Sequence, residues 1–352
     1  MINRRGLLSG VVAAPIVLQQ ERALAVLRNP KDFGTVGAGD DTAAINAAFS
    51  AIRTDGYGVL ELDGAQSAGG YARFYDVGSI NAQYCSRSTL QLHSGIVLRG
   101  SQMSTPAAIL DYGFSHEVVL DIQGAIYGGV NGPWGNESPS PAPVRPLCGI
   151  LAGGDADKIL IRSPKVTGWF KSACIGAISC ASIEVEGQAQ LIQRQPVMGD
   201  FGPSAPPALV LSSNPGEWGL QSVFTPLTNN VNAVVNFIWR GGEIHQINGI
   251  GGAGTGWPIY MRGIQVAAFR DVLIDTSRSA YGLFQGPNSD IIFDGCCFRN
   301  AESSGGLPAN PVSVFEGGAT NLRVYAPSPN NLQDACTGTP WAGTFTGASG
   351  QF

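Results

Sequence analysis

The sequence predicts an all-β fold, a right-handed parallel β-helix in which short strands of successive coils stack into one elongated solenoid. Charged residues make up only 13% of the 352 residues and 48 residues are glycine, so small and uncharged polar side chains must form much of the surface and its turns. Beyond residue 150, short apolar triplets recur at nearly even spacing, as expected when one strand of each coil stacks on the last. The formal charge of −5 and the absence of any basic run exclude a sequence-independent nucleic-acid binder.

The first 30 residues have two interpretations. Arg4-Arg5 precedes a mostly apolar run from Leu7 to Leu18, and Ala23-Leu24-Ala25 follows, which is similar to a twin-arginine export signal with its cleavage site. The same stretch resembles the opening of some tailed-phage structural proteins, which implies a retained anchoring segment. The apolar run is too short to span a bilayer, because a spanning helix needs about 20 apolar residues. Residues 1–30 are therefore expected to be an N-terminal anchor or a twin-arginine-like leader.

The most specific motif lies in residues 31–62. The stretch from Lys31 to Phe49, which contains Asp32-Phe33-Gly34 and Gly39-Asp40-Asp41-Thr42, closely resembles the entry motif of the pectate-lyase-like β-helix superfamily. Pectinolytic enzymes, related glycosidases and phage tailspikes share this motif. Residues 88–100 continue the pattern, alternating apolar and polar residues up to a glycine turn. The resemblance implies one β-helix over residues 31–326, with coils of roughly 20 to 30 residues.

A short helix is expected to open the solenoid. Asp40 or Asp41 can accept hydrogen bonds from the free amides of its first turn. The apolar residues that follow share one helical face, namely Ile45, Ala48, Phe49 and Ile52. Such a helix can cover the exposed core at the end of the solenoid, and residues 56–62 are then the first strand.

The apolar triplets predict how the later coils stack. Ile159, Ile183, Leu209 and Val235 each begin a triplet, at spacings of 24, 26 and 26 residues, and fit one strand per coil. The next steps, to Val272, Ile291 and Leu322, are 37, 19 and 31 residues, and this unevenness indicates inserted loops. Proline- and glycine-rich stretches at 128–146, 193–207 and 212–230 are long enough to be such loops, and they are expected to form the walls of a groove on one side. Residues 327–352 are expected to be an irregular C-terminal cap.

The strongest candidate for catalysis is a repeated pair of aspartates. Asp271-Val272-Leu273-Ile274-Asp275 and Asp290-Ile291-Ile292-Phe293-Asp294 share one pattern at a spacing of 19 residues. If successive coils align them, Asp271 stacks on Asp290 and Asp275 on Asp294, about 4.8 Å apart, close to the carboxylate separation of retaining glycosidases. The alternative is that these aspartates only bond to backbone amides in turns.

Three further features bear on a site. Glu243 and His245 alternate with an apolar residue, so both should point outward and form an acid/base pair or a solvated face. Aromatic rings stack on sugars, which makes Trp134, Trp218 and Trp257, in or beside loops, the candidates for substrate binding, unless they pin their own loops. With three histidines and seven cysteines but no CxxC pair, no metal site or cofactor is predicted, and the cysteines are expected to be buried thiols or to form one or two disulfides.

These observations lead to three functional hypotheses. The first is a virion spike or fibre protein that binds bacterial surface polysaccharide and cleaves it if the carboxylates are catalytic. Family resemblance implies a homotrimer, with the N-terminal segment contacting other virion proteins. The second is a polysaccharide lyase or glycoside hydrolase that the twin-arginine pathway exports to the periplasm or the outside of the cell. The third is a structural virion protein without a glycan site. The polygalacturonase motifs Asn-Thr-Asp, Asp-Asp and Gly-His-Gly do not occur as a set, so whether the chain is an enzyme stays open.

Overall fold

The computed structural model describes most of the chain between residues 26 and 299 and a few strands beyond. The described residues are 26–67, 69–130, 141–194, 204–228, 236–247, 255–276, 282–285, 288–299, 315–317, 321–325, 333–334, 339–340 and 350–351. Residues 1–25, on which the choice between anchor and leader rests, lie outside them. Among the described residues no helix is both long and apolar enough to cross a bilayer.

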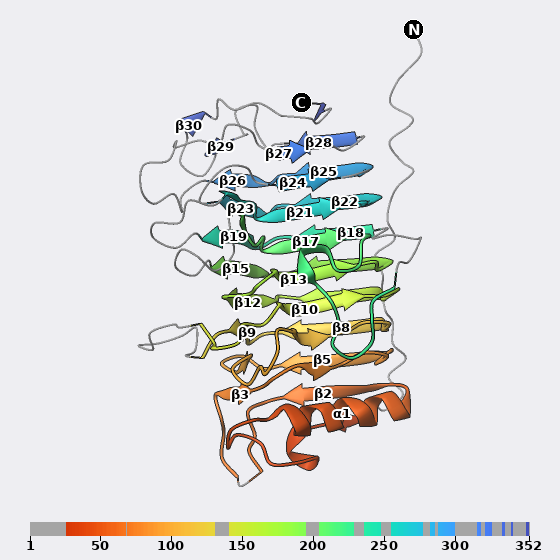
Figure 1. The fold of residues 1–352 in the computed structure, drawn as a ribbon, viewed down its shortest axis with the longest axis vertical. Helices are drawn as coiled ribbons and strands as arrows, with labels where there is room; N and C mark the ends of the chain where they lie inside the picture. The colour runs from red at the N-terminus through yellow and green to blue at the C-terminus, as the bar shows by residue number, and fades with distance from the viewer. Residues whose placement is uncertain are drawn as a thin grey trace.

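The described strands form three long sheets that run side by side along a solenoid (Figure 1). Sheet A contains β1 (Leu27–Arg28), β2 (Gly58–Leu62), β5 (Ser88–Leu92), β8 (His116–Ile122), β11 (Asp157–Arg162), β14 (Ser182–Glu186), β18 (Asn236–Arg240), β22 (Val266–Arg270), β25 (Asp290–Asp294), β28 (Asn321–Tyr325) and β31 (Gly350–Gln351). Sheet B contains β3 (Phe74–Asp76), β6 (Val97–Arg99), β9 (Ala125–Gly128), β12 (Lys165–Gly168), β15 (Gln190–Arg194), β19 (Glu243–Ile247), β23 (Leu273–Thr276) and β26 (Cys297–Arg299). Sheet C contains β4 (Ile80–Asn81), β7 (Ala108–Asp111), β10 (Cys148–Gly153), β13 (Ala173–Ile178), β17 (Leu209–Ser212), β21 (Ile259–Arg262), β24 (Gly282–Gln285) and β27 (Phe315–Gly317).

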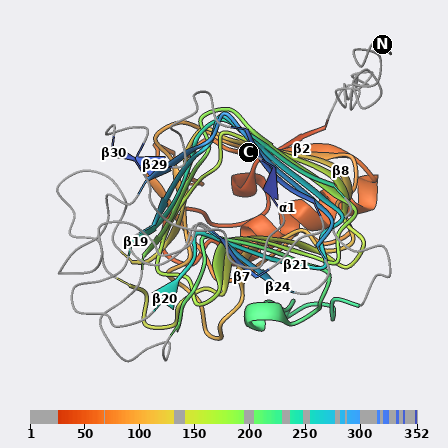
Figure 2. The same cartoon turned by 90° about the horizontal axis from the view of Figure 1, so that it is seen from above.

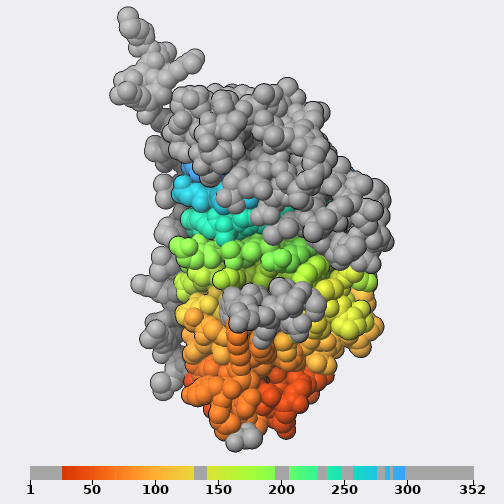
Figure 3. Space-filling model, turned by 90° about the vertical axis from the view of Figure 1, so that its left-hand side faces the viewer, coloured from red at the N-terminus to blue at the C-terminus, as the bar shows by residue number. Residues whose placement is uncertain are grey.

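Each coil passes once through sheets A, B and C, and each strand pairs in parallel with its equivalents in the coils before and after. Seen along the axis, the three sheets enclose one core (Figure 2). From the side, successive coils form bands along the long axis (Figure 3). The predicted parallel β-helix is confirmed. Two short pairs lie outside the three sheets, β16 (Ser204–Ala205) with β20 (Thr255–Gly256) and β29 (Gln333–Asp334) with β30 (Thr339–Pro340).

Alternation along the strands builds the core. In β11, β14 and β18 every second side chain is buried and the others face outward. The inward side chains of successive coils stack on each other, as Phe237, Phe269 and Phe293 do with ring centroids 5.5 and 4.9 Å apart. Five of the described cysteines are free and buried, namely Cys85, Cys148, Cys174, Cys180 and Cys296, which agrees with thiols that pack as small apolar residues.

Helix α1 (Thr42–Asp55) closes the N-terminal end of the core, as predicted. Ile45, Ala48, Phe49 and Ile52 are all buried. The Phe49 ring packs edge-on against the inward Tyr112, with centroids 5.9 Å apart. At the start of the helix the carboxylate of Asp40 accepts a hydrogen bond from the Thr42 amide at 3.0 Å, while Asp41 accepts from the amides of Gly37 and Asp76 instead. The short helix η1 (Pro30–Asp32) precedes α1.

The register of the triplets is confirmed in part and corrected in part. Ile159 pairs with Ile183, and Ile291 with Leu322, as the spacing predicted. The predicted stacking of Leu209 on Ile183 is wrong. Ile183 pairs with Phe237 in sheet A, while Leu209 lies in sheet C. Each coil carries three apolar strands, and a spacing near one coil length does not distinguish one sheet from another when loops of unequal length intervene.

Candidate functional site

A groove lies along the turn that joins sheet A to sheet B. Its volume is about 500 Å³. It is lined by residues of five successive coils, namely Ile122, Gln123, Gly124, Ser163, Lys165, Gln188, Ala189, Gln190, Gly242, Glu243 and Leu273. Because neighbouring coils are about 4.8 Å apart, five coils extend for about 19 Å along the solenoid axis. We call it the A–B groove.

Strand register aligns the polar side chains of the A–B groove in one column. Lys165 pairs with Gln190, and Gln190 pairs with Glu243, each as the first residue of its strand in sheet B. The residues that follow them, Val166, Leu191 and Ile244, are buried in the core. Lys165, Gln190 and Glu243 therefore face outward, one per coil.

The turn beside the groove has the same backbone shape in successive coils. Ser163, Gly187, Gly241, Asp271 and Gly295 occupy equivalent positions, each just after the paired end of a sheet A strand, and their φ angles lie between 47° and 85°. This left-handed conformation favours glycine and tolerates aspartate. Next to it, Gly242 has φ of 78°, and a Cβ there would overlap the carbonyl oxygen of Ala189. Glycine at position 242 therefore lets the backbone pass close to Ala189 directly before Glu243.

Glu243, His245 and Asp275 lie together at the end of the groove. His245 Nε2 is 2.8 Å from Glu243 Oε2, and His245 Nδ1 is 3.5 Å from Asp275 Oδ2. Gln190 donates a hydrogen bond to the other carboxylate oxygen of Glu243. The Glu243 side chain is 32% exposed, the His245 side chain 8% and the Asp275 side chain 0%. The exposed carboxylate thus faces the groove, and a buried imidazole and a buried carboxylate lie behind it.

The environment of His245 favours its protonated form. Burial by itself lowers the pKa of the imidazole, but hydrogen bonds and charge attraction from Asp275 and Glu243 outweigh burial and raise the pKa above its ordinary value of 6.5. With both nitrogens protonated, the ring donates toward both carboxylates and fixes their positions. Glu243 and His245, both expected to point outward, are in contact, and their acid/base role stays a prediction. His245 does lie on the outer side of sheet B, but it is buried rather than solvated.

The predicted stacking of the aspartates is wrong. Asp275 lies on β23 in sheet B and pairs with His245 and Arg299, whereas Asp294 lies on β25 in sheet A and pairs with Arg270. The two similar pentapeptides belong to different parts of the coil, since the first crosses the turn between sheets and the second is a single strand.

Asp290 and Asp271 do not stack either. Asp290 pairs with Val266 at the start of β25. Asp271 is a turn residue with φ of 54°, and its amide donates to the Asp294 carbonyl at 2.9 Å. Of the four aspartates, Asp275 is the one that lies beside His245.

The described tryptophans lie away from the lining of the groove. Trp218 packs edge-on against Tyr260 on the outer face of sheet C, with ring centroids 5.6 Å apart. Trp257 is 8% exposed, and its indole Nε1 has no hydrogen-bond partner among the described residues. Trp134 lies outside the described residues.

Sequence reasoning missed most of the groove. Gln123, Lys165, Gln188 and Gln190 were not singled out, although each lies within four residues of the end of a sheet A strand. Their position just after a sheet A strand was the available signal, and it becomes visible only once the sheet A strands are correctly aligned. Within the described part of the chain, no three or more His, Cys, Asp or Glu side chains are grouped so as to hold a metal ion.

Comparison with known proteins supports the fold. No protein-family model matches the sequence, and no curated protein does. Among solved structures, the Streptococcus pneumoniae surface protein and adhesin PfbA is similar over 93% of this chain and 86% of its own, with 13% identity and a TM-score of 0.58. The enzymatically active domain of tailspike protein 2 from bacteriophage CBA120 matches 86% of this chain and 48% of its own at 13% identity, with a TM-score of 0.43. At this level of identity the likeness to PfbA shows that the chain is a parallel β-helix.

Proposed function

We propose that the chain binds a linear polysaccharide along the A–B groove. The observation that carries this proposal is the column of Lys165, Gln190 and Glu243, which places one polar side chain on each of three successive coils. The coil spacing of about 4.8 Å is close to the rise of one sugar residue in an extended polysaccharide. Consecutive sugar units can therefore each meet a polar side chain at an equivalent position on these three coils.

The chemistry of the lining suits sugar hydroxyls. The amides of Gln123, Gln188 and Gln190 and the hydroxyl of Ser163 each donate and accept hydrogen bonds, as hydroxyl groups do. The groove extends over five coils rather than enclosing one small molecule, which suits a polymer.

Cleavage of the bound chain is a second candidate function, favoured by the contact of Glu243 with buried His245. A carboxylate that faces the groove and is held by Gln190 and an imidazole can transfer a proton to or from a bound sugar. Among the described residues that line the groove, Glu243 is the one carboxylate. The two facing carboxylates of ordinary glycoside hydrolysis are therefore not supplied by these residues, and binding is the better supported role.

The biological setting is also a proposal. We favour a virion spike or fibre, assembled as a homotrimer, that binds bacterial surface polysaccharide. An exported or cell-surface protein is the alternative, and a structural virion protein without a glycan site is the third. The surface adhesin PfbA has the same fold. This supports a role outside the cell, which both the virion spike and the exported protein would have.

Affinity electrophoresis through gels that contain bacterial capsular polysaccharides tests binding. For a polysaccharide that retards the wild type, Gln188→Ala and Lys165→Met should each weaken binding about 2- to 10-fold, as expected for one lost hydrogen bond. Gln91→Ala is the matched control, because Gln91 is a half-buried residue of β5 that faces outward on sheet A. Equal affinity of all four proteins, or no retardation by any polysaccharide, would contradict the proposal.

Cleavage is tested on the same samples. Glu243→Gln should abolish the release of new chain ends and leave binding within a few-fold of the wild type. If the wild type releases no chain ends from a polysaccharide that it binds, the cleavage hypothesis is wrong and the binding role stands.

A further inference from the structure

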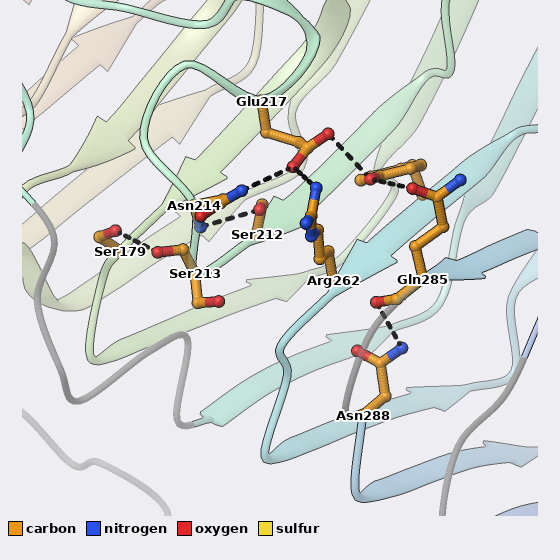
Figure 4. A network of polar contacts seen from close by, with 9 residues as sticks. Ser179, Ser212, Ser213, Asn214, Glu217, Arg262, Gln285 and Asn288 are labelled. Atoms are coloured by element: carbon orange, nitrogen blue, oxygen red, sulfur yellow. Dashed lines mark hydrogen bonds and ion pairs between the residues drawn. The ribbon is translucent and has the colours of Figure 1, made fainter.

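A second cluster of polar side chains lies on the outer face of sheet C, beneath the segment that follows β17 (Figure 4). Its centre is Glu217, in the short helix η2 (Glu217–Gly219). Glu217 Oε1 accepts a hydrogen bond from the Tyr260 hydroxyl at 2.9 Å, and Glu217 Oε2 accepts from Arg262 at 2.9 Å. Both partners lie on β21. We call this group the sheet C cluster.

Planar polar groups of the sheet C cluster are exposed at its rim. The Arg262 side chain is 42% exposed, whereas that of Glu217 is only 15% exposed. Gln285 is exposed on β24, and its side-chain oxygen is 3.1 Å from the Tyr260 hydroxyl. Asn214 is exposed as well and donates to Glu217 Oε2 at 3.4 Å. Glu217 thus fixes the orientation of Arg262 and Asn214 directly, and that of Gln285 through Tyr260. The outer edges of these side chains contact solvent, and such preorganisation lowers the entropic cost of binding.

Trp218 stands at the edge of the same cluster, in a turn with left-handed backbone. Its φ is 53°, between Gly216 at 77° and Gly219 at 68°. Other turn residues of the solenoid, such as Ser163 and Asp271, share this left-handed conformation. The conformation leaves the indole half buried, edge-on to Tyr260 and beside Glu217. The loop therefore presents an aromatic ring next to the polar rim.

We propose that the sheet C cluster is a second saccharide-binding site, which takes one uncharged pyranose unit. The C–H face of the sugar contacts Trp218, and its hydroxyls contact Arg262 and Gln285. The ligand is uncharged because the opposite charges of Glu217 and Arg262 offset each other. Only the ligand class rests on the proposed function of the A–B groove, since the two sites lie on different sides of the solenoid.

The cluster binds rather than catalyses. Burial raises the pKa of Tyr260, and hydrogen bonding and charge repulsion from Glu217 raise it further, so the hydroxyl stays protonated and acts as a donor. Both oxygens of Glu217 are already occupied by hydrogen bonds from within the cluster. Two binding sites on one solenoid increase the avidity for a surface that displays many copies of a polysaccharide.

Fluorine NMR of the full-length protein, labelled with 5-fluorotryptophan, tests this site. The chain has six tryptophans, and the resonance that Trp218→Phe removes is assigned to Trp218. The probes are cellohexaose, maltohexaose and xylohexaose, each titrated separately, with hexagalacturonic acid as the charged comparison. All samples also carry Glu243→Gln, which blocks the proposed cleavage. We expect a saturable shift of the Trp218 resonance with at least one neutral hexasaccharide.

Two variants connect the shift to the cluster. Arg262→Met and Gln285→Ala should each weaken the binding that the Trp218 resonance reports by about 2- to 10-fold, while Gln91→Ala should leave it unchanged. Gln285→Ala keeps the ion pair between Glu217 and Arg262, so it decides the outcome if Arg262→Met unfolds the loop.

Three results would overturn the proposal. In the first, no neutral hexasaccharide shifts the Trp218 resonance. In the second, only hexagalacturonic acid shifts it. In the third, neither Arg262→Met nor Gln285→Ala changes the affinity that this resonance reports. Failure of the A–B groove would be seen separately, because the Gln188→Ala comparison reports on that groove alone.

Discussion

Replacing His245 by leucine is expected to lower the free energy of unfolding by about 3 kcal/mol. The carboxylate of Asp275 is fully buried, and the imidazole of His245 lies 3.5 Å from it. Removing one partner of a buried charge pair costs about 3–5 kcal/mol, because the other charge stays buried without compensation. Asp275 has a further interaction beyond His245, so the lower end of that range applies. Urea unfolding at pH 7, followed by tryptophan fluorescence, measures the loss.

The double variant His245→Leu/Asp275→Leu separates the charge pair from simple packing. Replacing both partners by apolar side chains removes the buried charge together with its partner, which is often close to neutral. Because Asp275 has a further interaction, Asp275→Leu is measured as well, and the double variant should lose less stability than the two single variants together. A loss below about 1 kcal/mol in His245→Leu, or losses of the two single variants that simply add in the double variant, would refute the inferred pairing.

The free energy of unfolding should also decrease as the pH rises, and this decrease should depend on His245. Because the pKa of His245 is raised in the folded protein, the folded state keeps its proton at pH values where the unfolded chain has released it. The stabilisation is therefore complete below about pH 6.5 and declines as the pH rises through the folded pKa. His245→Leu should lack this decline, whereas His93→Leu, a control at an exposed histidine, should keep it. An equal decline in both variants would contradict the assignment.

Three further substitutions test other parts of the structure. Burial raises the pKa of Asp111 above its ordinary value of 3.8, so its ionisation costs stability as the pH rises from that ordinary value through the raised pKa. Asp111→Asn should therefore raise the urea midpoint at pH 7 and by less at pH 4, and a lower midpoint at pH 7 would contradict this. Gly242→Ala forces a Cβ against the Ala189 carbonyl at positive φ, and should lower the unfolding free energy by more than about 1 kcal/mol, whereas an unchanged melting temperature would show that the turn adapts. Phe49→Ala removes a buried ring packed on Tyr112 and should cost about 3–5 kcal/mol in urea unfolding, while a loss under about 1 kcal/mol would mean that the helix does not share the core.

Much of the fold could be predicted from local patterns. The apolar face of α1 and the alternation in β2 follow directly from residue periodicity, and the step from Ile159 to Ile183 follows from an uninterrupted coil. Coil register could not be predicted where loops are inserted. Ile183 and its true partner Phe237 are 54 positions apart, and the apolar Leu209 of another sheet lies between them.

The candidate site was only partly predictable for the same reason. Glu243 and His245 are close in sequence, so their contact could be inferred from strand alternation alone. Asp275 joins them only through the pairing of β19 with β23, which requires the register. The resemblance of Asp271–Asp275 to Asp290–Asp294 was misleading, because a turn and a strand shared one pattern of aspartates and apolar residues.

The A–B groove is tested most directly by a crystal structure of the Glu243→Gln variant with an oligosaccharide cut from a polysaccharide that the protein binds. The sugar chain should run parallel to the solenoid axis, with successive units beside Lys165, Gln190 and residue 243, about one unit per coil. A chain that crosses the coils at right angles, or one bound on another face while the A–B groove contains no sugar, would contradict the account.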